Sequence, residues 1–247
     1  MVSEARFLSN TLAFAQGVEA RCGPVSRGWW MFRQTVYLMS AEANEAVLFD
    51  REGRFSAKKG WERVLAELFP QLCQACDEHG QQYSDEEIVD HLIFLMMAAH
   101  DTTTSAITTM VYAMARHPQW QERLRVEART AVDRLRVAGR SAATLDDLAT
   151  MTQTEWVFKE ALRLYQPLPT IARRALADVE IHGMRIPAGT PVAVFPIQVH
   201  RSPRWWSEPD HFDPERFSPA RAEHRRHPFA WVPFGGGAHM CLGLHFA

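Results

Sequence analysis

The chain has 247 residues, of which 47% are hydrophobic and 23% are charged, and its formal net charge is −2. This is the composition of an ordinary globular protein with enough apolar side chains for a large core. The near-neutral charge excludes a strong field for nucleic acid, and we expect neither a signal sequence nor a membrane anchor. Four cysteines are too few for a secreted disulfide framework, so we expect a cytoplasmic protein.

The N-terminal quarter of the chain combines short helical and extended patterns. Aromatic and β-branched residues predict a hairpin that turns at Arg33 and Gln34. Strong helix formers and charged breaks predict the other elements. These elements are a helix over 7–20, the hairpin over 29–39, a helix over 41–49 and a loop over 50–60.

Two helices are predicted in the middle of the chain. Residues 84–87, Ser-Asp-Glu-Glu, form a capping box, in which two side chains satisfy free amides at a helix N-terminus. The helix that follows is predicted to end near His117, because Pro118 cannot continue it. Residues 119–136 then predict an amphipathic helix. Its apolar face is Trp120, Leu124, Ala128 and Ala131.

A third helix and a small β region are predicted next. Residues 152–155, Thr-Gln-Thr-Glu, form a second capping box and predict a helix through Leu164, ended by Pro167. Short apolar runs between Gly and Pro turns then predict four strands. The strands cover residues 171–173, 179–182, 184–186 and 192–195, and an irregular segment follows over 200–232.

The strongest functional signal is the cysteine loop, residues 234–243, Phe-Gly-Gly-Gly-Ala-His-Met-Cys-Leu-Gly. Glycines let a backbone turn tightly and approach a flat ligand closely. A helix predicted to begin near Cys241 would place its free amides beside the sulfur and stabilise a thiolate. The alternative is a free, buried cysteine beside a glycine-rich turn.

The cysteine loop resembles that of the cytochrome P450 family. The resemblance implies a mainly α fold with a small β portion, and it implies haem b with Cys241 as the axial ligand of the iron. A thiolate in that position donates electron density that favours O–O cleavage. His239 is then expected to bind a haem propionate. The other loop residues expected to contact haem are Phe234, Gly237 and Gly243.

Residues 98–103, Ala-Ala-His-Asp-Thr-Thr, resemble the dioxygen-binding segment of the same family. Ala99 stands where the family usually has Gly, a small change that leaves room beside the haem. The resemblance implies that Thr102 hydrogen-bonds the activated dioxygen and that Asp101 relays protons towards it. The run of hydroxyl side chains also predicts a local kink or opening of the helix. The alternative is a set of ordinary polar residues on a helix.

Three charged residues resemble the structural triad of the family. Glu160 and Arg163 are three residues apart on the third helix and can pair on one face. Residues 212–217, Phe-Asp-Pro-Glu-Arg-Phe, resemble the segment that supplies the third member, Arg216. The resemblance implies a buried Glu160–Arg163–Arg216 cluster with a structural role. Taken alone, the pair reads as a solvated surface pair.

The first strand of the β region supplies further candidates. The resemblance indicates Arg173 as a second propionate ligand, with Arg174 as its alternative, although an exposed strand arginine would look the same. The turn before the strand occupies the place of a substrate-contacting turn. Its expected pocket residues are Leu168, Thr170 and Ile171.

A separate pair, Cys73 and Cys76, forms a lone Cys-x-x-Cys. A zinc site would need two more ligands, and His79 supplies at most one. A thioredoxin-like role would need a strand before the pair and a helix after it. We therefore interpret the spacing as coincidence, with a metal or redox module as the rival interpretation.

The resemblance leaves part of the family pattern unmatched. Residues 1–70 resemble its β-rich N-terminal part and residues 71–247 the stretch from the distal helix to the cysteine loop, which together predict one domain. Between these parts the family has further helices, with a Trp and an Arg for a propionate and a roof over the substrate. We find no counterpart of them and expect an incomplete fold.

The resemblance implies a monooxygenase that inserts one atom of O2 into a lipophilic small molecule. Electrons would come from NAD(P)H through a ferredoxin or flavodoxin-type partner. The rival hypothesis is a non-catalytic, truncated remnant of such an enzyme that binds haem weakly or not at all.

Overall fold

The computed structural model describes residues 10–30, 33–56, 59 and 85–245. It is mainly helical with a small β portion, as the sequence predicts. The helices are α2 (Thr11–Cys22), α3 (Ala41–Leu48), α5 (Asp85–Arg116), α6 (Pro118–Val137), α7 (Leu145–Ala149), α8 (Thr152–Leu164) and α9 (Pro196–Val199). Short 3-10 helices are η1 (Pro214–Phe217), η2 (Glu223–Arg225), η3 (Gly237–His239) and η4 (Leu242–His245).

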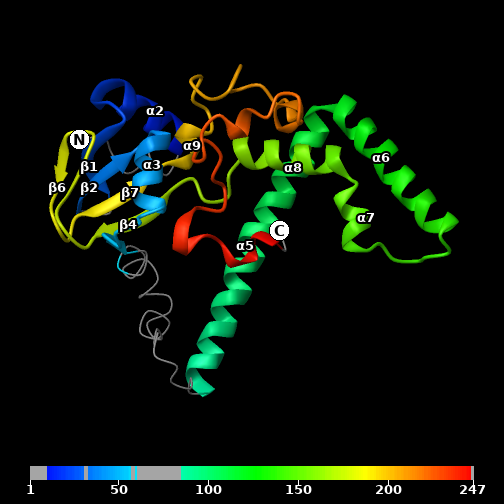
Figure 1. The fold of residues 1–247 in the computed structure, drawn as a ribbon, viewed down its shortest axis with the longest axis horizontal. Helices are drawn as coiled ribbons and strands as arrows, with labels where there is room; N and C mark the ends of the chain where they lie inside the picture. The colour runs from blue at the N-terminus through cyan, green and yellow to red at the C-terminus, as the bar shows by residue number, and fades with distance from the viewer. Residues whose placement is uncertain (1–9, 31–32, 57–58, 60–84, 246–247) are drawn as a thin grey trace.

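Figure 1 shows a sheet with its short helices at one end of the molecule and the longer helices at the other. The strands are β1 (Val25–Trp30), β2 (Arg33–Leu38), β3 (Phe55–Ser56), β4 (Ile171–Ala175), β5 (Val179–Ile181), β6 (Met184–Ile186) and β7 (Pro191–Val194). Five of them form one sheet in the order β1-β2-β7-β4-β3, and β5 pairs with β6. In the large sheet, β2 and β7 run parallel and the other neighbours run antiparallel.

The predicted hairpin is confirmed, but its predicted turn is wrong. Arg33 and Gln34 pair with Trp30 and Trp29 inside the β1–β2 ladder, so the hairpin starts earlier, at Val25. The predicted loop over 50–60 also contains the short strand β3. The Asp50 carboxylate accepts hydrogen bonds from the amides of Arg54 and Phe55, which bends the chain back onto β4.

The main core lies between the large sheet and the helices α3 and α9. Alternate residues of the central strands point into it, because successive side chains of a strand face opposite sides. They include Val36, Leu38, Val192 and Val194, each at most 1% exposed. A second cluster on the sheet joins the rings of Phe14, Tyr37 and Phe195, with centroids 5.5 to 6.2 Å apart.

A third cluster joins the longer helices. It contains Ala113 and Met114 of α5, Trp120 of α6 and Val157 of α8. Met110, Leu124 and Phe212 pack against it. On α6, Ala128 is exposed, although the sequence predicts it on the apolar face, whereas Ala131 is half-buried. This packing fixes α5 to the molecule through its C-terminal part.

The prediction of a capping box at residues 152–155 is wrong, although the helix itself is confirmed. Met151 is the N-cap of α8, and Thr152 is already helical. The Glu127 carboxylate of α6 instead accepts hydrogen bonds from the amides of Gln153 and Thr154, both at 2.8 Å. A capping box does form at α7, between Thr144 and Asp147. The other predicted box, at residues 84–87, lies partly outside the described residues.

Candidate haem-thiolate site

The cysteine loop folds back on itself and leaves the side chain of Cys241 exposed. The Cys241 amide donates a hydrogen bond to the carbonyl oxygen of Phe234 at 2.9 Å, which closes the loop. The predicted alternative of a buried thiol is therefore wrong. Gly235 and Gly237 have φ values of 75° and 68°, a backbone conformation that favours glycine. These two glycines allow the chain to reverse its direction in the loop that carries the exposed Cys241 sulfur.

Gly237 also fixes where the loop sits. A β-carbon at this position would lie 1.8 Å from the carbonyl oxygen of Leu48, at the end of α3. The loop therefore rests directly on α3, and a larger residue at Gly237 would push the two apart. The sequence predicts that the glycines of this loop allow a close approach to a ligand. The structure shows that Gly237 also allows the loop to approach the backbone of α3.

The residues around the sulfur are arranged as an open surface. Phe234 and Gly237 are half-buried, and His239 and Gly243 are exposed. The predicted helix after Cys241 is, within the described residues, the 3-10 helix η4, and the Leu244 amide donates to the Cys241 carbonyl oxygen at 3.3 Å. A β-carbon at Gly243 would lie 3.7 Å from the Cys241 sulfur. The absence of a side chain there keeps the thiol accessible.

The segment 98–103 lies on α5, which continues without a break through it. The predicted local opening is wrong, because the Thr102 hydroxyl donates to the carbonyl oxygen of Ala98 at 2.6 Å alongside an intact helix. Asp101 is exposed, and its Oδ1 lies 2.9 Å from Nδ1 of His100. Ala99 is exposed as well. These residues therefore stand on an accessible face of the helix.

Glu160, Arg163 and Arg216 meet in a fully buried cluster. Glu160 binds Arg163 through two hydrogen bonds, at 2.7 and 2.8 Å, and its Oε1 lies 3.3 Å from Nε of Arg216. Arg163 also donates to the carbonyl oxygens of His200 and Pro209, at 2.7 and 2.6 Å. The cluster thus joins α8 to η1 and to the irregular segment between β7 and the cysteine loop.

Sequence reasoning missed a fourth member of this cluster, Glu223. Its side chain is 1% exposed, and its carboxylate lies 3.2 Å from Arg216 and 2.7 Å from Arg221. Burial alone would raise the pKa of Glu223, but hydrogen bonds from Arg221 and the Ser207 amide, with the charge of Arg216, hold this pKa at about 2. No spacing rule singles out this glutamate. The only signal is an acidic residue inside a run of basic residues, 221–227.

Arg173 is 4% exposed on β4, whereas its neighbour Arg174 is half-buried. The Arg173 guanidinium donates a hydrogen bond to a neutral acceptor, the Ala172 carbonyl oxygen, at 2.8 Å. Burial lowers the pKa of Arg173 to about 10, and the charge of Asp50 opposes this shift. A buried cation without an ion pair among the described residues can accept an anionic group.

The three expected pocket residues differ in how exposed their side chains are. Leu168 is exposed, while Thr170 and Ile171 are buried at the start of β4. The δ-carbon of Ile171 would lie 3.8 Å from a β-carbon at Gly235, so this side chain reaches the cysteine loop. The structure therefore brings Ile171, but not Leu168, against the loop.

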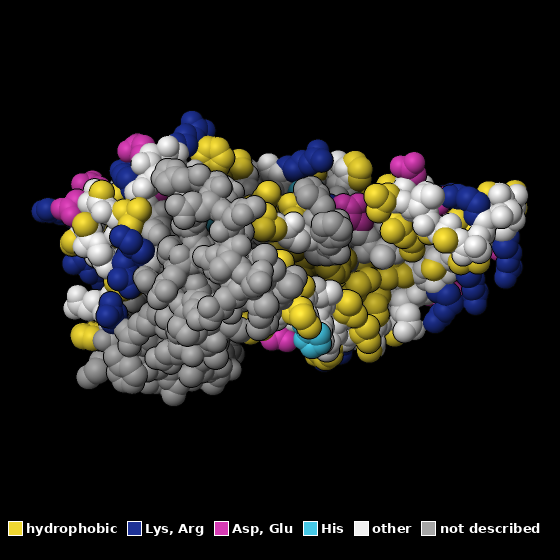
Figure 2. Space-filling model, turned by 90° about the horizontal axis from the view of Figure 1, so that it is seen from below, with side chains coloured by type: hydrophobic (Ala, Val, Ile, Leu, Met, Phe, Trp, Pro, Cys, Tyr) yellow, Lys and Arg dark blue, Asp and Glu magenta, His cyan; other side chains and the backbone are white. Residues whose placement is uncertain are grey.

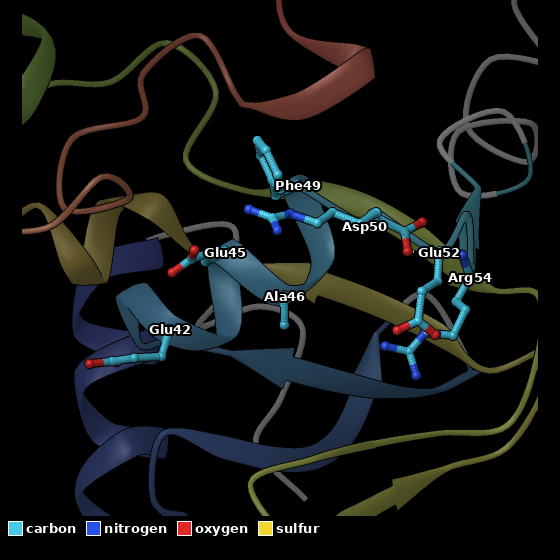
Figure 3. A pocket seen from close by; sticks show the side chains of 8 residues that line it. Glu42, Glu45, Ala46, Phe49, Asp50, Glu52 and Arg54 are labelled. Carbon is cyan, nitrogen blue, oxygen red and sulfur yellow. Dashed lines mark hydrogen bonds and ion pairs between the residues drawn. The ribbon is translucent and has the colours of Figure 1, made fainter.

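A hollow of about 320 Å³ lies at the C-terminal end of α3 (Figure 3). It adjoins the cysteine loop, because a β-carbon at Gly237 would lie 3.2 Å from Cα of Phe49, one of its lining residues. Its polar lining is already paired: Asp50 holds two backbone amides, and Glu52 lies 3.3 Å from Arg54. The Arg51 guanidinium carbon lies 4.8 Å from the centroid of the Phe49 ring. Its lining residues are Glu42, Glu45, Ala46, Phe49, Asp50, Arg51, Glu52 and Arg54.

The rival metal or redox module, Cys73, Cys76 and His79, lies outside the described residues. Within the described part of the chain, no group of three or more His, Cys, Asp or Glu side chains is arranged to hold a metal ion. No helix in that part combines the length and apolar character needed to cross a membrane.

The residues present fit a haem. The accessible Cys241 thiol is the soft donor that haem iron accepts, and its neighbour Gly243 carries no side chain. Arg173 is a buried cation that forms no ion pair within the described chain, and His239 is exposed on the same loop as the sulfur. This donor set fits a haem-thiolate site on a mainly helical fold.

Comparison with known proteins agrees with this class. Residues 58–247 match the family model described as Cytochrome P450, and the chain belongs to this family. The Mycobacterium tuberculosis protein described as cytochrome P450 136 is 44% identical, covering 73% of this chain and 35% of that protein. Human cytochrome P450 4V2 is 36% identical, covering 79% of this chain and 36% of that protein. The chain thus spans about a third of the length of these relatives.

A solved structure shows the same fold. Retinoic acid-bound cyanobacterial CYP120A1 superposes with a TM-score of 0.78 at 20% identity, covering 98% of this chain and 86% of that chain. This likeness extends over both the sheet and the longer helices. The expected fold, a mainly α cytochrome P450 fold with a small β portion, is therefore confirmed.

Proposed function

We propose that this chain is the haem-binding part of a monooxygenase that inserts one oxygen atom from O2 into a lipophilic substrate. The observation that carries the proposal is the exposed sulfur of Cys241, held by a loop in which two glycines adopt the left-handed conformation. Membership of the cytochrome P450 family supports the reaction class.

The residues proposed to hold haem b come from the cysteine loop and β4. Cys241 would bind the iron, and Arg173 and His239 would each donate hydrogen bonds to a propionate. Phe234, Gly237, Gly243 and Ala99 would lie against the macrocycle. When bound, haem with a thiolate ligand supplies reductive activation of dioxygen.

The proposed proton path runs along α5. The Thr102 hydroxyl donates to the Ala98 carbonyl oxygen, so its oxygen can accept a hydrogen bond from a second donor. Asp101 is exposed to solvent and contacts His100, which allows its carboxylate to take up a proton from water. We propose that Asp101 delivers protons and that Thr102 orients the group that receives them.

The proposed substrate is an apolar small molecule that contacts Leu168, Thr170 and Ile171. Electrons would come from NAD(P)H through a ferredoxin or flavodoxin-type protein. Glu160, Arg163 and Arg216 have no part in this chemistry in the proposal. Their buried cluster instead holds the irregular segment that leads into the cysteine loop.

The test is the absorption spectrum of the purified chain loaded with hemin, reduced and exposed to carbon monoxide. A thiolate ligand is expected to give a strongly red-shifted Soret band in the parent protein, and Cys241→Ser is expected to abolish it. Cys22→Ser is the matched control, because Cys22 is also a free, exposed cysteine. Loss of the band in Cys22→Ser, or its persistence in Cys241→Ser, would contradict the ligand assignment.

A second candidate is a chain of the same fold that binds haem weakly and is not catalytic. The exposed face of α5 favours it, because Ala99 and Asp101 stand open to solvent instead of facing a closed pocket. This candidate predicts that hemin is lost on gel filtration, and the first candidate predicts that it is retained.

A further inference from the structure

His200 lies at the C-terminal end of α9 and is completely buried. It follows a helix of the sheet region and precedes the irregular segment that leads to the cysteine loop. A fully buried histidine needs partners for its polar groups, because an unsatisfied polar group is costly away from water. Its contacts therefore show what the residue holds in place.

Two hydrogen bonds connect His200 to distant parts of the chain. Its carbonyl oxygen accepts from Nη1 of Arg163 at 2.7 Å, which ties it to the Glu160 cluster on α8. Its ring Nε2 accepts from the amide of Val232 at 2.9 Å. His200 thus connects the buried Glu160 cluster to Val232, which lies nine positions before Cys241.

The bond to Val232 continues into the cysteine loop. The Val232 carbonyl oxygen accepts from the amide of Gly235 at 3.2 Å, and the Phe234 carbonyl oxygen accepts from the amide of Cys241 at 2.9 Å. Val232 itself is 6% exposed. The imidazole of His200 therefore holds Val232, and Val232 holds the first turn of the cysteine loop through Gly235. The hydrogen bond between Cys241 and Phe234 then joins the two ends of the loop.

The ring can serve as an acceptor only in one form. Since Nε2 accepts a hydrogen bond from an amide, the proton of the neutral ring must be on Nδ1. Burial lowers the pKa of His200 to about 3, and the charge of Arg163 adds to this effect. The ring therefore remains a neutral acceptor throughout the physiological pH range. Nδ1 itself has no hydrogen-bond partner among the described residues.

We propose that His200 is a positioning residue for the axial thiolate, because its ring anchors the cysteine loop to the buried Glu160 cluster. The inference rests on the proposed function for the role of the thiolate. The anchoring itself is independent of haem. Within the described residues, the hydrogen bonds of His200 reach Arg163, Val232 and its own neighbours, so its effect on Cys241 passes through Val232 and the backbone of the loop.

The test compares two substitutions that differ only in the acceptor. His200→Gln keeps an oxygen near the position of Nε2, whereas His200→Leu fills the space without an acceptor. His211→Leu is the matched control, because the His211 carbonyl oxygen also accepts from Arg163 while its ring is exposed. All three variants keep the main-chain bond to Arg163.

The first readout is amide hydrogen exchange over residues 232–241 in the haem-free chain. We expect exchange at Val232 to rise about tenfold in His200→Leu, the effect of losing one buried hydrogen bond, and to stay near the parent rate in His200→Gln and His211→Leu. Equal exchange in the parent and in His200→Leu would overturn the proposal. Equal loss of protection in the Leu and Gln variants would also overturn it, because the acceptor would then not matter.

The second readout is the carbon monoxide spectrum of the hemin-loaded chain. We expect His200→Leu to shift part of the red-shifted band to the position of a haem without a thiolate ligand, and His200→Gln to restore it. A parent protein that shows no red-shifted band would refute the proposed function and leave the exchange result to decide the anchoring. An unchanged band in His200→Leu would refute the positioning role.

Discussion

At Arg173, burial lowers the pKa and the charge of Asp50 opposes this shift. The guanidinium is 4% exposed on β4, and burial lowers its pKa to about 10. A charge in this position is retained at a cost in stability unless an anion approaches it. The same side chain would therefore be an unfavourable residue in an empty protein and a favourable one beside a carboxylate of a bound ligand.

Arg173→Leu is expected to weaken hemin binding by about 10 to 100-fold, the effect of losing a charged hydrogen-bond partner. The free energy of unfolding without hemin should stay equal or rise, since an unpaired buried charge is removed. Hemin titration and urea unfolding measure the two effects. Arg174→Leu is the control, because adjacent strand residues face opposite sides. Lower stability with unchanged hemin affinity would show a purely structural role.

The pKa of His200 also predicts a pH dependence of stability. The folded value of about 3 lies below the ordinary value of 6.5, so the unfolded chain binds a proton that the folded chain cannot. Below pH 6.5 the free energy of unfolding should therefore fall by about 1.4 kcal/mol per pH unit from this residue. Urea unfolding between pH 6 and 5 should show a shallower slope in His200→Gln than in the parent protein. Identical slopes would mean that the ring titrates normally.

At the scale of elements, the N-terminus of α8 is capped by a side chain of the neighbouring helix α6. The Glu127 carboxylate of α6 holds the amides of Gln153 and Thr154 and the Thr154 hydroxyl. Amides at a helix N-terminus need an acceptor, and a negative charge there also interacts favourably with the helix dipole. α8 carries Glu160 and Arg163, so this contact supports the start of the helix that builds the buried cluster.

Glu127→Ala is expected to lower the free energy of unfolding by about 1 to 2 kcal/mol, the usual effect of losing a helix cap. Glu127→Gln should lose less, because the amide keeps one acceptor oxygen. Glu122→Ala, an exposed residue of the same helix, is the control and should change stability by less than about 0.5 kcal/mol. Equal effects of the alanine variants in urea unfolding would contradict the cap.

The elements show where sequence reasoning succeeds. Local signals predict four helices. Apolar spacing predicts α3 and α6, and terminating prolines with expected capping residues predict α5 and α8. The cap from Glu127 could not be predicted, since it joins residues 26 positions apart on different helices. Glu223 was missed for the same reason, and so was the anchoring contact of His200 to Val232. Such contacts depend on tertiary packing, which no local pattern encodes.

At the scale of the molecule, the exposed apolar face of α5 is the most unusual feature. Met96 is 73% exposed and Val111 is 63% exposed, and Leu95, Ile107 and Tyr112 are about half exposed. Figure 2, which views the molecule from below, shows hydrophobic side chains gathered on that side. This exposure agrees with the expected incomplete fold, in which the helices that roof the substrate in the family have no counterpart.

Met96→Lys combined with Val111→Lys should reduce self-association and the fluorescence of a bound hydrophobic dye. Contiguous exposed apolar surface favours both processes. The free energy of unfolding should change by less than about 0.5 kcal/mol, as for other surface residues. Met114→Lys on the same helix is the contrasting variant, because Met114 is buried against α6 and α8 and should unfold the chain. A loss of more than about 2 kcal/mol in the double variant would mean that this face is covered in solution.

The strand order has a consequence for synthesis on the ribosome. β7 fills the place between β2 and β4, so the inner edge of the early hairpin can gain its parallel partner only after Val194 has left the exit tunnel. More than 150 residues separate these two strands, and closing so long a loop is slow. Until then, the unpaired amides and carbonyls of β2 offer a template for other nascent chains. Expression yield should therefore depend on how quickly the second half of the polypeptide is completed.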